Sequence, residues 1–232
     1  MSRPDLSRER VDYSAGILTE EQAGTDPHAL FDQWLQDALT RRDEAGDLPE
    51  PNAMVLATAD PHTLQPHART VLLKEHEQGR FEFFTNYGSA KGREIASNAR
   101  VSLNFTWPPL QRQVRIEGVA EMLPGEASDA YHRIRPRGAQ IGAWASPQSE
   151  QVADRDELRT RHRTMEEQFA GEEVPRPPHW GGYAVVPERI EFWQGGGDRL
   201  HDRIVFTRAA GTPADSEDSA AMGEWTVKRL AP

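Results

Sequence analysis

The sequence predicts a mainly β protein, an antiparallel barrel with peripheral α-helices. Short strand patterns are separated by tight turns, and helical patterns do not alternate regularly with the strands. Neither G-x-G-x-x-G after a strand nor G-x-x-x-x-G-K-[ST] occurs. These observations disfavour a doubly wound parallel sheet. A chain of 232 residues is long enough to bury a substantial core.

Residues 1–25 are polar and weakly patterned, and we expect a mobile N-terminal arm followed by one domain over residues 26–232. A helix begins at Pro27, with Asp26 as its N-cap. Its apolar residues recur at helical spacing: Leu30, Phe31, Trp34, Leu35, Ala38 and Leu39. The charged segment 41–51 ends in Pro-Glu-Pro and is expected to be a loop.

Strand patterns dominate from residue 52 to residue 123. Residues 101–107 alternate apolar and polar side chains, which is typical of a strand with one buried face. Further strands are expected at 54–58, 70–74, 81–85 and 114–119. Residues 89–98 predict a short helix that begins near a serine.

Helical patterns return over residues 124–171, where the charged stretch 150–173 predicts a helix that covers a surface. Strands are then expected at 183–186, 190–193, 204–206 and 225–227. The acidic segment at about 209–222 is low in apolar residues and predicts a long flexible hairpin loop.

The chain is acidic and has no cysteine. It has 27 Lys and Arg against 37 Asp and Glu, a formal net charge of −10, which gives no global attraction for nucleic acid. The absence of cysteine excludes disulfides, thiolate metal sites and cysteine nucleophiles. Apolar runs are far shorter than the roughly 20 residues that span a bilayer, and no secretory signal is evident. We therefore expect a soluble cytoplasmic protein without nucleic-acid or membrane partners.

Basic residues gather at separate points on this acidic chain: Arg69 and Lys74, Lys91 and Arg93, Arg133, Arg135 and Arg137, and Arg199 and Arg203. Guanidinium groups bind phosphate through paired, charge-assisted hydrogen bonds, so the pattern indicates a small anionic ligand such as a phosphate ester. Solvated surface charges that pair with the acids are the alternative, and charge alone favours it.

His201 and Asp202 form either an acid–base pair or an ordinary loop contact. Trp193 either stacks on a flat ring or packs in a core or an interface. No H-E-x-x-H and no G-x-S-x-G motif occurs, so no metal site or serine hydrolase is predicted. By themselves, these patterns predict an anion-binding β-barrel protein and no more specific function.

Six segments in order, with their spacing preserved, resemble the pyridoxine/pyridoxamine 5′-phosphate oxidase family over nearly the whole chain. They are RTVLLK (69–74), FFTNYGSAKGREI (83–95), LQRQVRIEG (110–118), YHRIRPR (131–137), QIGAWASPQS (140–149) and IEFWQGGGDRLHDR (190–203). The resemblance implies an antiparallel, Greek-key-like split β-barrel and a homodimer with FMN at the subunit interface.

The resemblance also implies which residues bind FMN. Arg69 and Lys91 match its phosphate ligands, and Gln148 and Ser149 are expected to reach it from the partner subunit. The full set is Arg69, Thr70, Val71, Leu72, Lys74, Phe84, Thr85, Lys91, Gln113, Gln148, Ser149, Trp193 and Arg203.

For the substrate, Lys74, Tyr131 and Arg135 match the residues that grip its 5′-phosphate. Arg199 and His201 match residues at the vitamer ring and are the catalytic candidates. Arg10 and Tyr13 fall where the N-terminal arm closes over the site in relatives. The implied reaction oxidises pyridoxamine 5′-phosphate, pyridoxine 5′-phosphate or both to pyridoxal 5′-phosphate, with O2 as acceptor and H2O2 as product.

Two positions depart from the family pattern. Ala90 stands where an arginine is usual and Ala139 where a serine is usual, which removes one guanidinium and one hydroxyl. The departures imply a looser cofactor, compensation from Arg93 or Arg137, or a changed substrate. A split-barrel flavin oxidase for another aromatic substrate and a non-catalytic flavin- or vitamer-binding protein are the alternative functions.

Overall fold

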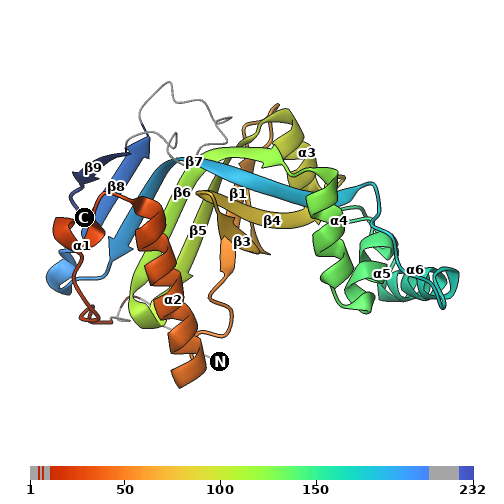
Figure 1. Cartoon of the computed structure of the whole chain (residues 1–232), viewed down its shortest axis with the longest axis horizontal. Coiled ribbons are helices and arrows are strands. Elements are labelled where there is room, and N and C mark those ends of the chain that lie inside the picture. Colours follow the sequence, from red (N-terminus) through yellow and green to blue (C-terminus); the bar gives the residue numbers. More distant parts are fainter. Residues whose placement is uncertain (1–4, 6, 8–10, 209–224) are drawn as a thin grey trace.

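The computed structural model describes residues 5, 7, 11–208 and 225–232. Within them, nine strands form one curled antiparallel sheet, a half-barrel that confirms the predicted antiparallel barrel class (Figure 1). Arg10 and the predicted loop at about 209–222 lie outside the described residues. The strands follow the order β2 (Pro66–Leu72), β1 (Ala53–Ala59), β5 (Arg100–Trp107), β6 (Arg112–Met122), β7 (Trp180–Gln194), β4 (Arg80–Asn86) and β3 (Glu75–Glu77), while β8 (Asp202–Arg208) pairs with β7 and β9 (Trp225–Arg229) with β8.

Strand β7 organises this sheet. It pairs with β6 along its length, whereas its other edge pairs first with β4, from Trp180, and then with β8, from Arg189. The register with β6 shifts at Gly118, where a Cβ would lie 2.2 Å from the carbonyl oxygen of Val186. The adjacent Pro187 has no N–H to donate, so a bulge here bends the sheet. The two strands expected at 183–186 and 190–193 are therefore one strand.

Helix α2 (Pro27–Ala45) closes the core over the sheet. Phe31 packs against Phe81 and Phe105 at 4.9 and 5.1 Å between ring centroids, and Trp34 packs against Phe192 at 5.2 Å. Asp26 caps the helix as predicted. The expected loop from residue 41 was wrong at its start, because the helix continues to Ala45.

The other helices lie at the margins of the sheet. They are α1 (Glu20–Ala23), α3 (Ala90–Ser97), α4 (Gly125–Ile134), α5 (Arg137–Ala145) and α6 (Arg155–Gln168), with single turns at Pro108–Leu110 and Gly197–Arg199. Figure 1 shows α4, α5 and α6 together at one end of the molecule, away from α2. The sequence patterns missed α1 and β3. Within the described ranges, none of the helices has the length and apolar character to cross a membrane.

Candidate functional site

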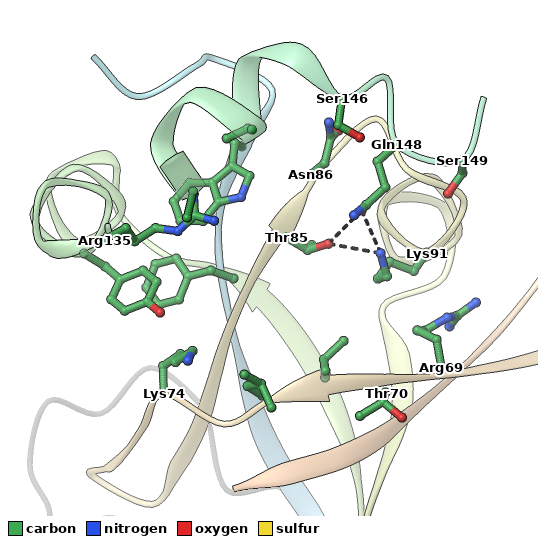
Figure 2. Close-up of a pocket in the computed structure, with 18 of the residues that line it drawn as sticks. Arg69, Thr70, Lys74, Thr85, Asn86, Lys91, Arg135, Ser146, Gln148 and Ser149 are labelled. Atoms are coloured by element: carbon green, nitrogen blue, oxygen red, sulfur yellow. Dashed lines mark hydrogen bonds between the residues drawn. The ribbon is translucent and has the colours of Figure 1, made fainter. Parts of the chain in front are cut away.

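A cavity of about 930 Å³ opens between strands β2 and β4 and the segment that carries α4 and α5. Twelve of the expected site residues line it: Arg69, Thr70, Val71, Leu72, Lys74, Phe84, Thr85, Lys91, Tyr131, Arg135, Gln148 and Ser149. Figure 2 shows Arg69 and Lys91 on one side of this pocket and Lys74 and Arg135 on the other. Two separated pairs of cations therefore face one cavity.

Gln148 belongs to the same chain's pocket. Its Oε1 accepts a hydrogen bond from Lys91 Nζ at 2.8 Å, and Lys91 also reaches Thr85 Oγ1 at 3.2 Å. Ser149 lines the same cavity. The expectation that Gln148 and Ser149 come from a partner subunit is wrong in this structure, because the chain after α5 turns back over the start of α3 (Figure 2).

The start of α3 holds Lys91 at the pocket. Ser89 caps the helix by accepting from the Gly92 N–H, and its own hydroxyl donates to the Asn86 carbonyl at 2.7 Å. A Cβ on Gly92 would lie 2.2 Å from the Tyr87 carbonyl oxygen, so glycine permits this tight turn. Burial lowers the pKa of Lys91 below its ordinary 10.5, and the positive charge of Arg69 lowers it further. An anion in the pocket would favour the charged form of Lys91 and so offset both effects.

Aromatic rings support the other pair of cations. Phe84 stacks on Tyr131 at 4.0 Å and on Trp180 at 5.5 Å. Lys74 Nζ lies 5.9 Å from the Tyr131 ring, and the Arg135 guanidinium lies 4.5 Å from the Trp180 ring. Among the described residues, the buried Nη1 of Arg135 has no hydrogen-bond acceptor, and burial lowers the pKa of this guanidinium. This end of the pocket is thus a positive site with unused donor capacity.

Both departures from the family pattern, Ala90 and Ala139, line the pocket. The structure does not support compensation for them by either arginine. The Arg93 guanidinium donates to the Gly88 carbonyl, and Arg137 donates to the carbonyls of Phe169 and Glu172. Neither arginine lines the cavity.

The remaining expected residues form a second cluster, defined by Tyr13, Gln113, Trp193, Arg199, His201 and Arg203. Gln113, Trp193 and Arg203 are neighbours across β6, β7 and β8. The Trp193 ring lies 4.7 Å from His201 and 5.7 Å from Tyr13. None of these six residues lines the pocket.

The backbone determines which nitrogen of His201 carries the proton. The Gly196 N–H donates to His201 Nδ1 at 3.1 Å, so the neutral ring carries its proton on Nε2 and presents a donor there. Two residues shortly before His201 have a left-handed backbone conformation: Asp198 with a φ of 54° and Arg199 with a φ of 63°. Such backbone strain in non-glycine residues concentrates at functional sites.

Two kinds of residue around these clusters were not predicted from the sequence. Trp180 and Asn86 line the pocket. Glu191 is a buried carboxylate that accepts from Arg115, Arg189 and Arg203 at 2.6 to 2.7 Å. Glu191 could have been found from the alternation of side chains along a strand, because it lies two residues before Trp193 and so shares its face of the sheet.

Two family models match the chain. Residues 42–169 match the pyridoxamine 5′-phosphate oxidase model, and residues 180–232 match the pyridoxine 5′-phosphate oxidase C-terminal dimerisation region. A pyridoxine/pyridoxamine 5′-phosphate oxidase of Rubrobacter xylanophilus is 53% identical over 89% of this chain and 93% of its own length. One of Burkholderia multivorans is 48% identical over 96% and 97%, respectively.

Solved structures give the same fold. PhzG from Burkholderia lata, in complex with tetrahydrophenazine-1-carboxylic acid, superposes with a TM-score of 0.81 at 27% identity over 94% of this chain and 98% of its own. A pyridoxamine 5′-phosphate oxidase-related, FMN-binding protein from Nostoc punctiforme has a TM-score of 0.65 at 16% identity, over 87% and 97%.

Proposed function

Because the chain belongs to the pyridoxamine 5′-phosphate oxidase family, we propose that it is an FMN-dependent oxidase that makes pyridoxal 5′-phosphate from pyridoxamine 5′-phosphate, pyridoxine 5′-phosphate or both. One observation carries the proposal: a single pocket has two cationic ends, Arg69 with Lys91 and Lys74 with Arg135. A phosphorylated cofactor and a phosphorylated substrate each require such an end.

The pocket residues fit FMN. Arg69 and Lys91 would hold its phosphate, and the β2 backbone from Arg69 to Leu72 would lie along the flavin. The lowered pKa of Lys91 and the unused donor of Arg135 indicate that the pocket is built for anions. A cavity of about 930 Å³ is within the usual range for cofactor sites.

A homodimer would complete the site. The dimerisation model covers residues 180–232, which include Trp193, Arg199, His201 and Arg203. These residues lie at the far end of β7 from the pocket of their own chain. In the dimer, the second cluster of one subunit would face the pocket of the other, and FMN would then lie at the subunit interface.

In the mechanism, binding of the substrate phosphate orients the reacting carbon. Lys74, Tyr131 and Arg135 would grip the phosphate, and this remote binding energy would hold C4′ in place. Bound FMN supplies the acceptor for the hydride that leaves C4′. His201 would donate from Nε2 to a ring substituent, because Nδ1 is already held by Gly196. Arg199 would orient the same ring. The amine, O2 and water become the aldehyde, ammonia and H2O2; the alcohol needs no water.

The structural similarity to PhzG supports one rival, an oxidase for an aromatic substrate without phosphate. The end formed by Lys74 and Arg135 argues for a phosphorylated substrate, because two cations match the double negative charge and three acceptor oxygens of a phosphate better than the single charge of a carboxylate. A carrier that only binds flavin or vitamer is a second rival, and the presence of Arg199 and of His201, whose ring lies beside Trp193, favours catalysis.

The test is reduction of the purified yellow protein without oxygen. We expect pyridoxamine 5′-phosphate, pyridoxine 5′-phosphate or both to bleach the flavin absorbance, and air to restore it with formation of H2O2. Pyridoxamine without phosphate should bleach it far more slowly. Equal or faster bleaching by tetrahydrophenazine-1-carboxylic acid would favour the rival oxidase, and no bleaching by any of these compounds, both phosphorylated vitamers included, would favour a carrier.

The roles of Arg199 and His201 are tested separately from cofactor binding. Arg199→Met and His201→Ala should lower turnover while the flavin stays bound. Loss of flavin with unchanged turnover per bound flavin would reverse the assignment and make these residues cofactor ligands.

A further inference from the structure

Glu94 is a buried acid directly behind the cationic end formed by Arg69 and Lys91. It lies on α3 with 7% of its surface exposed, although it does not line the pocket. Its Oε2 accepts from the Thr58 hydroxyl and, at 3.4 Å, from Arg69 Nη2. Its Oε1 accepts from His67 Nδ1 at 2.7 Å. Both carboxylate oxygens are thus engaged on strands β1 and β2.

Thr58 links this acid to Arg69 a second time. Arg69 Nη1 donates to the Thr58 hydroxyl, which itself donates to Glu94. Nη1 also lies 3.4 Å from the carbonyl oxygen of Leu56, directly opposite Arg69 in the β1–β2 ladder. Both terminal nitrogens of Arg69 are therefore held from behind, by β1 and α3, while the residue lines the pocket.

Glu94 is ionised when the site is in use. Burial opposes its ionisation, but the hydrogen bonds from Thr58 and His67 and the charges of His67 and Arg69 outweigh burial and bring its pKa below 4.5. A carboxylate only accepts, so His67 must carry a proton on Nδ1. The group acts on Arg69 as a fixed negative charge with oriented hydrogen bonds.

We propose that Glu94 is a positioning residue that, together with Thr58, holds the Arg69 guanidinium in the orientation that meets the cofactor phosphate. The inference rests on the proposed function, because it takes that phosphate to be the one of FMN. It extends the set of residues that determine cofactor affinity to an acid, which no search for phosphate ligands would select.

If Glu94 positions Arg69, loss of its charge should weaken FMN binding, which is the opposite of what electrostatic repulsion alone predicts. A negative charge behind a phosphate site repels the phosphate, so its removal should strengthen FMN binding if Glu94 acts only through charge. If Glu94 positions Arg69, its removal frees a guanidinium that must be ordered again on binding, and FMN binding weakens. Riboflavin, which has the same ring system but no phosphate, should bind unchanged in either case.

The experiment compares FMN and riboflavin dissociation constants, measured by flavin fluorescence, for the wild type and Glu94→Gln. We expect the preference for FMN over riboflavin to fall about tenfold, the loss of one charge-assisted hydrogen bond. Thr58→Val, which removes the bridging hydroxyl, should shift the preference in the same direction and decides the question if Glu94→Gln does not fold. Glu188→Gln is the control, because Glu188 pairs with Arg100 on an exposed surface.

In an Arg69→Ala background, Glu94→Gln should no longer weaken FMN binding, since the group that it positions is gone. An unchanged or increased preference for FMN in both Glu94→Gln and Thr58→Val would overturn the positioning role and leave the proposed function intact. A wild-type protein that does not prefer FMN to riboflavin would overturn the proposed function and, with it, this inference.

Discussion

Trp180 and Trp193 lie at the first and next-to-last positions of the same strand, β7. Trp180 lines the pocket beside Arg135, whereas Trp193 packs against His201. At the usual rise of a strand, the two rings are about 40 Å apart along the chain's path. Only Trp180 of the two lines the pocket, so we expect the two clusters to share one ligand when two copies of the chain come together.

Mixed dimers test this arrangement. Arg135→Ala damages the pocket and His201→Ala damages the second cluster, so each variant alone should be nearly inactive. Random pairing of equal amounts of both subunits leaves one intact site in about half of the dimers, and about a quarter of the wild-type activity should return. The measurement is the H2O2 rate of co-expressed, separately tagged subunits. A site formed within one chain would show no recovery.

A restored arginine should tighten the cofactor site. Ala90 lines the pocket, while Arg93 and Arg137 are bound to backbone carbonyls. We expect Ala90→Arg to raise FMN affinity about tenfold through a new charge-assisted hydrogen bond. Ala96→Arg adds the same charge at an exposed position of α3 and serves as the control. Equal effects of the two variants in a fluorescence titration would point to charge alone.

As the pH rises, FMN affinity should begin to fall at a lower pH than it would if Lys91 had the ordinary lysine pKa. The pKa of Lys91 lies below 10.5, because burial and Arg69 disfavour its charged form. The phosphate prefers the ammonium form, so affinity declines once the pH passes the pKa of Lys91 in the free protein. Lys91→Arg, which stays charged, should flatten this decline in dissociation constants measured from neutral to alkaline pH. Riboflavin controls for effects on the ring, and a decline that persists in Lys91→Arg would assign it to another group.

Glu191 should be critical for stability. It is 5% exposed and pairs with three arginines, so Glu191→Gln removes the buried carboxylate at the centre of this network and should cost about 3 kcal/mol in urea unfolding. Of the acids that the structure describes, Arg115 and Arg189 would then keep only the half-exposed Glu117 as a partner. Glu117→Gln is the control, because Glu117 is half-exposed and should cost less than about 1 kcal/mol. A similar cost for the two variants would contradict the buried network.

The stabilisation by Glu191 should also depend on pH in the acid range. Burial works against the ionisation of Glu191, but its hydrogen bonds from Arg189 and Arg203 prevail and hold its pKa below 4.5. A lowered folded-state pKa stabilises the protein above the unfolded value, and this stabilisation is lost as the pH falls through the folded value. The stability gap between wild type and Glu191→Gln should therefore narrow in acid, as measured by urea unfolding at each pH.

Local patterns were sufficient for most elements. The alternation of residues 101–107 identified β5, and the cap and apolar stripe of α2 identified its start, because these signals depend on neighbours in the chain. The same local view divided β7 at Pro187, since a proline without an N–H is typical of a strand end. Only the pairing with β6, which accommodates the bend at Gly118, keeps the two halves in one strand.

Residue types and their spacing were enough to identify the family, the antiparallel barrel class and the cationic residues of the pocket. The folded structure was needed to show which of these residues share a cavity. It joined Gln148 to Lys91, separated His201 from Arg135, and placed the acids Glu94 and Glu191 behind the arginines. These contacts depend on pairing and packing between segments that are distant in the chain. The spacing of residues along one strand or helix therefore does not predict them.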